Sequence, residues 1–69
     1  MPDPEVKQKA CNEIEAHESQ ISFCQVTLAF FISINFIEPG SADETSVLDY
    51  IKWLQAELET FQDLKEKNT

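Results

Sequence analysis

The chain has 69 residues, 42% of them hydrophobic, and carries 13 acidic residues against five lysines and no arginine. Its net charge of −8 disfavours direct binding to nucleic acid, because proteins neutralise phosphates with Lys and Arg. A single domain this short buries only about 60% of its unfolded surface. We therefore expect self-association or a partner chain to stabilise it.

Cysteine and histidine are too few to stabilise the chain. Two cysteines cannot form a disulfide framework, and His17 with Glu13 one turn earlier is too small a ligand set for a metal. We expect no metal and no cofactor. Cys24 fits a core position, whereas Cys11 lies off the predicted seam, where a symmetric bridge between two chains is the redox arrangement to consider. The N-terminus, MPDPEVKQKA, does not resemble a secretory signal, which predicts a cytoplasmic protein.

The first predicted element is a long helix. Asp3 fits a helix cap, and Pro4 fits the first helical turn. Residues then recur at intervals of four and three, which is the spacing of one helix face. The members of this stripe are Ala10, Ile14, His17, Ile21, Cys24, Leu28 and Phe31.

The stretch Ile21–Ile37 is ambiguous between helix and strand. It holds four of the five phenylalanines and no charge, and its residues from Cys24 onward alternate as in a strand. A helix is favoured because a 13-residue strand exceeds the usual length and the chain offers no second strand. The alternative is an α-β-α chain in which residues 23–37 form a strand paired between two chains.

A turn and a second helix follow. Glu38-Pro39-Gly40 ends the first element, and Ser41 with Glu44 fits a capping box. Apolar residues then recur along one helix face. They are Val47, Ile51, Leu54, Leu58 and Phe61.

The sequence predicts an all-α fold with one domain, residues 1–69. Helices over about 4–37 and 42–66 form an antiparallel hairpin that places His17 near Phe61 and associates into a four-helix bundle. The first helix is the longer, so we expect its N-terminal turns to overhang the second. The oligomer interface is predicted to comprise residues of this overhang and of the uncovered far side: Val6, Ala10, Ile14, Phe30, Ile34 and Ile37.

A second predicted surface lies on the second helix. Tyr50 and Trp53 are three residues apart, beside the predicted seam rather than in it, and Trp and Tyr are frequent anchors of protein interfaces. With Glu57, one turn later, they are the predicted partner-binding residues. The partner is expected to be another protein, and a basic surface would complement the negative charge.

Enzyme motifs are missing, since one glycine cannot build a phosphate-binding loop and one histidine has no catalytic support. We therefore predict a small acidic, non-enzymatic protein–protein interaction module: a regulator, inhibitor or assembly factor that self-associates. One alternative is an acidic decoy that occupies the nucleic-acid-binding groove of a partner. Another is a small membrane-associated protein using residues 19–37, against which the acidic flanks Glu18 and Glu38 count.

Overall fold

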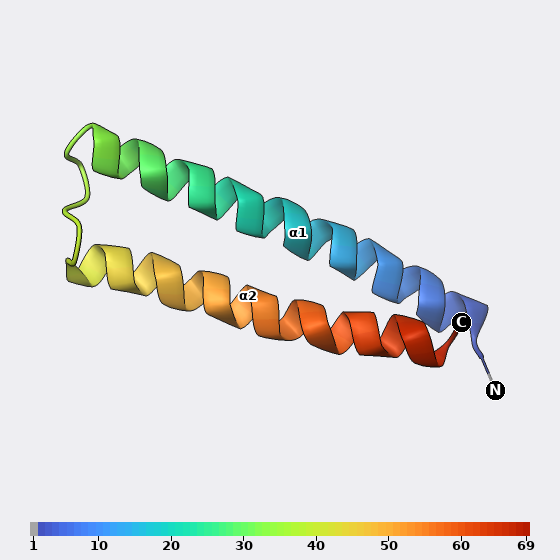
Figure 1. Cartoon of the computed structure of the whole chain (residues 1–69). Helices are drawn as coiled ribbons and strands as arrows, with labels where there is room; N and C mark the ends of the chain where they lie inside the picture. The colour runs from blue at the N-terminus through green and yellow to red at the C-terminus, as the bar shows by residue number, and fades with distance from the viewer. Residues whose placement is uncertain (1) are drawn as a thin grey trace.

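The chain folds into two packed helices. The computed structural model describes residues 2–69, with α1 at Pro4–Ser33 and α2 at Ala42–Lys67. The helices run antiparallel, so both termini lie at one end of a rod about 51 Å long (Figure 1). The predicted all-α hairpin is confirmed. The strand alternative for residues 23–37 is wrong, because the described residues contain no strand.

Helix α1 begins at the predicted cap. The Asp3 carboxylate accepts hydrogen bonds from the backbone N–H groups of Glu5 and Val6, at 2.9 and 3.3 Å. These are two of the N–H groups that have no partner inside a helix. Pro4 takes the first helical position, where its missing N–H is not needed.

Helix α1 ends at Ser33, four residues before the predicted end at Ile37, because Asn35 takes a left-handed conformation with φ of 63°. The N–H of Phe36 donates to the Phe31 carbonyl at 2.9 Å, and that of Asn35 donates to Ile32 at 3.1 Å. This is the Schellman pattern of a helix C-terminus. The rings of Phe31 and Phe36, 5.0 Å apart, supply its usual apolar contact.

The linker, residues 34–41, turns the chain into α2. The N–H of Ser41 donates to the Glu38 carbonyl at 3.1 Å, and Gly40 has φ of 81°. Pro39 at the second position and a positive φ at the third fit a type II turn. The predicted capping pair is present: Ser41 Oγ accepts from Glu44 N–H at 3.3 Å, and the Glu44 carboxylate accepts from Gly40 N–H at 2.8 Å.

The core is the narrow seam between the helices. Leu28, Ile51 and Leu54 are buried there, and no described side chain is both large and fully buried. The rings of His17 and Phe61 lie 5.4 Å apart, which confirms the predicted register. The seam is therefore continuous but thin.

Two expectations about the uncovered surface are wrong. Helix α2 reaches the start of α1, where Asp3 N–H donates to Asn68 Oδ1 at 3.0 Å, so α1 does not overhang. Ala10 is fully buried and Val6 and Ile14 are half-buried, because α1 is shorter than predicted and starts level with the end of α2. Ile37 is buried too, since the linker folds back and places it beside Leu28, Phe31 and Val47.

Leucines buried in the seam should contribute more to the free energy of unfolding than exposed leucines do. Leu54→Ala removes a side chain that is only 4% exposed and should lower the free energy of unfolding by about 2–5 kcal/mol. Leu48→Ala makes the same deletion at 42% exposure and should cost under about 1 kcal/mol. Urea denaturation at one fixed protein concentration measures both. Equal losses would contradict the observed register.

Candidate protein-interaction surface

Exposed apolar side chains gather in the half of the hairpin that contains the linker. Leu64 apart, all large apolar side chains that are exposed in residues 2–69 lie between residues 23 and 53. They are Phe23, Val26, Phe30, Ile34, Phe36, Leu48, Tyr50 and Trp53. Large contiguous apolar patches are uncommon on the surfaces of monomeric proteins, so these side chains define the candidate interaction surface.

The largest part of this surface is a stripe along α1. Phe23, Val26, Phe30 and Ile34 follow one another at intervals of three, four and four residues, so they share one face of the helix. Leu28 on the opposite side is buried against α2. We call these four residues the outer stripe. The predicted interface residues Phe30 and Ile34 belong to it, whereas Ala10 and Ile37 are buried inside the hairpin and leave the set.

Tyr50 and Trp53 form a second exposed feature on α2. Their rings are stacked, with centroids 5.9 Å apart and an angle of 18° between the planes, and Trp53 is 55% exposed. The pair was predicted from spacing alone, and the structure brings the two rings together. Stacking restricts both rings before any partner arrives, which lowers the entropy that binding must overcome.

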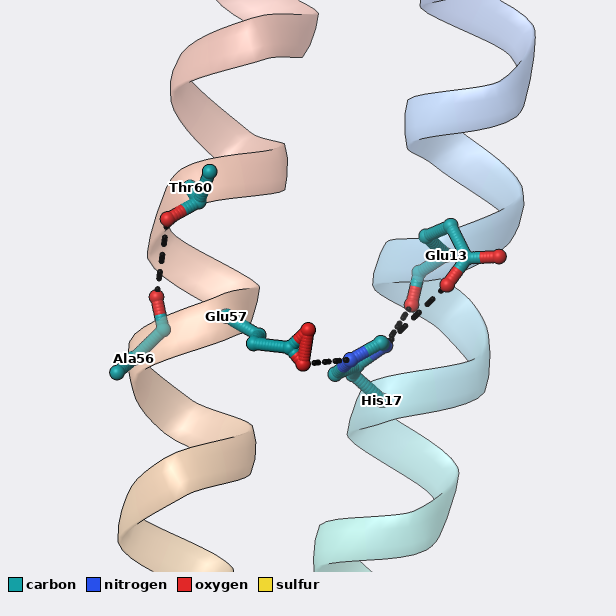
Figure 2. Close-up of polar contacts among 5 residues, drawn as sticks. All are labelled: Glu13, His17, Ala56, Glu57 and Thr60. Atoms are coloured by element: carbon teal, nitrogen blue, oxygen red, sulfur yellow. Dashed lines mark hydrogen bonds and ion pairs between the residues drawn. The ribbon is translucent and has the colours of Figure 1, made fainter.

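Glu57, the third predicted partner residue, lies in a polar cluster across the seam (Figure 2). His17 Nδ1 donates to the Glu13 carbonyl at 2.7 Å, and His17 Nε2 lies 3.7 Å from the Glu57 carboxylate. Glu13's own carboxylate is 3.8 Å from Nδ1. A carbonyl oxygen only accepts, so Nδ1 carries a proton, and protonation of Nε2 would complete an ion pair with Glu57. Glu57 thus contacts the partner helix of the hairpin rather than pointing freely outward.

Of the shallow grooves along the seam, two are mainly apolar. One, of about 180 Å³ and almost wholly apolar, lies beside the linker and is lined by Phe23, Cys24, Thr27, Leu28, Phe31, Ile37 and Val47. The other, of about 400 Å³, lies near the chain termini and is lined by Val6, Lys9, Ala10, Asn12, Glu13, Phe61 and Leu64. The groove beside the linker adjoins the outer stripe through Phe23, so it enlarges that apolar surface. Sequence reasoning missed it because Ile37 forms its wall only once the linker folds back.

The described residues offer little else for chemistry. Among residues 2–69, no three potential metal ligands come together. Cys11 and Cys24 are free and half-buried. Neither described helix combines the length and apolarity needed to cross a membrane.

The structure therefore defines the class of an antiparallel two-helix hairpin with an apolar outer stripe. Comparisons with models of known families, with curated proteins and with solved structures find no match.

Trp53 can be tested as a surface residue. Trp53→Ala should leave helicity unchanged and alter the free energy of unfolding by about 0.5 kcal/mol or less, since the ring is mostly exposed. Phe61→Ala, which removes the ring that packs on His17, should cost about 2 kcal/mol or more. Circular dichroism and urea denaturation measure both. Unfolding of Trp53→Ala would show that its ring is part of the core.

Proposed function

We propose that this protein is a small acidic, non-enzymatic interaction module that self-associates through the outer stripe and binds a second protein through Tyr50 and Trp53. It would act as a regulator, inhibitor or assembly factor. The observation that carries the proposal is the clustering of exposed apolar side chains in one half of the rod. The charge-free run from Ser19 to Ile37 supports it, because no charged side chain along that run opposes burial.

The exposed area supports self-association. The chain exposes 5184 Å² at a mass of 7.9 kDa. A compact folded monomer of that mass is expected to expose about 4400 Å². The excess of about 800 Å² matches what each partner buries in an interface of standard size. Two helices alone have no third element to cover the outer stripe, and a second copy would supply it.

The proposed partner surface is separate from the outer stripe. Tyr50 and Trp53 belong to α2, and their stacked rings offer an apolar face with a hydroxyl and an indole N–H at its edge. The net charge of −8 would speed the approach of a basic partner. A reducing cytoplasm is the proposed compartment, and the free thiols of Cys11 and Cys24 fit it.

Self-association is tested by light scattering in dilute buffer. The wild type should show the mass of a dimer or larger assembly. Phe30→Glu, at a position 56% exposed on the outer stripe, should shift the mass to that of a monomer, because it would bury a charge without a partner. Leu48→Glu, on α2, is the matched control and should keep the assembly. A wild type that stays monomeric at every concentration would contradict the proposed self-association.

Partner binding is tested by capture from the source cell with the wild-type chain as bait. Trp53→Ala should reduce the captured partner at least tenfold, and Trp53→Phe should retain most of it, because a ring anchors the contact. Binding led by these rings should persist when salt is raised from about 0.1 to about 1 M, which shortens the Debye length from about 10 to about 3 Å.

The acidic decoy is the competing outcome of the same experiment. Its binding would fall steeply over that salt range and would be insensitive to Trp53→Ala. Such a result would replace the aromatic surface with the acidic one as the binding site.

A further inference from the structure

We propose that two copies pack outer stripe against outer stripe with their α1 helices antiparallel, about a two-fold axis level with residue 28. The inference rests on the proposed self-association and goes on to specify which element, which direction and which register it uses. Three features of α1 support it: the symmetry of the charge-free run, the order of large and smaller residues, and the position of the acids.

The charge-free run is centred on the proposed axis. It extends from Ser19 to Ile37, so its midpoint is residue 28. Two antiparallel copies of α1 that overlap about this midpoint face each other over residues 23–33, which carry no charge. An axis two residues nearer the N-terminus would set Glu18 of one copy opposite Ile34 of the second copy.

The same axis makes the outer stripe complementary to itself. Antiparallel pairing about residue 28 sets Val26 opposite Phe30 of the second copy and brings Phe23 within one residue of Ile34 of the second copy. Each phenylalanine ring then meets a smaller aliphatic side chain, which favours interdigitation. A parallel pair would instead set each ring against its own counterpart and each small residue against its own, leaving a gap at Val26.

Two acidic residues of α1 favour antiparallel over parallel pairing of the two copies. Glu15 lies eleven residues before Val26 and Glu5 lies eighteen before Phe23, so both continue the face of the outer stripe toward the N-terminus. Both are exposed. A parallel pair would hold each glutamate against its counterpart, and like charges across an interface are unfavourable. In the antiparallel pair they lie beyond the overlap, at opposite ends of the assembly.

The distance between two spin labels tests whether the α1 helices of the two copies run antiparallel. Glu15→Cys, in a chain with Cys11→Ser and Cys24→Ser, carries one label per copy, and pulsed dipolar spectroscopy reports their separation. At a rise of 1.5 Å per residue, the antiparallel pair places residue 15 of the two copies about 40 Å apart along the axis. A parallel pair would hold them within about 20 Å, since packed helices are only 8–10 Å apart.

Ala29→Cys in the same background is the control position. It is exposed and nearly level with the axis, so its two labels should lie within about 20 Å of each other. A short distance at both positions would overturn the antiparallel direction. A long distance at residue 29 would overturn the use of α1 while leaving self-association standing. A monomer in light scattering would instead overturn the proposed function.

Cross-linking tests the register independently of the labels. Equal amounts of Val26→Cys and Phe30→Cys chains, both with Cys11→Ser and Cys24→Ser, are mixed and oxidised. The antiparallel register should yield mainly mixed disulfides, well above the half expected for random pairing. A majority of bridges between like chains would contradict the register, and circular dichroism of each variant checks that the helices remain.

Discussion

A two-helix hairpin has one seam, and each helix can bury only one face in it. Helix α2 buries Ile51 and Leu54 in this seam and leaves Leu48 and the Tyr50–Trp53 pair exposed beside it. Helix α1 buries Leu28 there, and Phe23, Val26 and Phe30 are exposed on its opposite face. The surplus apolar face follows from the number of helices rather than from any local defect in packing.

The linker decides how much of α1 stays uncovered. The Schellman end at Asn35 stops the helix, and the turn at Pro39-Gly40 sends the chain back beside it. As a result Ile37 folds over the end of the seam and is buried, while Ile34 and Phe36 remain exposed. The same short end brings α2 level with the start of α1, so that Asn68 caps Asp3 across the two termini.

At His17 the two helices are joined by polar contacts as well as by apolar packing. Away from the linker the two helices meet at His17, whose ring lies 5.4 Å from the ring of Phe61 and is tilted by 55° to it. Glu13 and Glu57 flank this histidine (Figure 2). Polar contacts of this kind fix a register, because they are satisfied in only one alignment of the helices.

The sequence by itself determined the two helices, their caps at Asp3 and Ser41, their antiparallel pairing and the pairing of His17 with Phe61, because capping chemistry and helical spacing are local signals. It also placed Tyr50 and Trp53 on one face. The end of α1 at Asn35 could have been predicted, since asparagine often adopts the left-handed conformation that ends a helix. Pro39 and Gly40 were the stronger turn signals, so the helix was predicted to extend to Ile37. Only the tertiary structure decided that Ala10 and Ile37 are buried and that Glu57 faces His17. Whether a residue is buried depends on which distant segment packs against it, and the spacing of residues within one helix does not specify that segment.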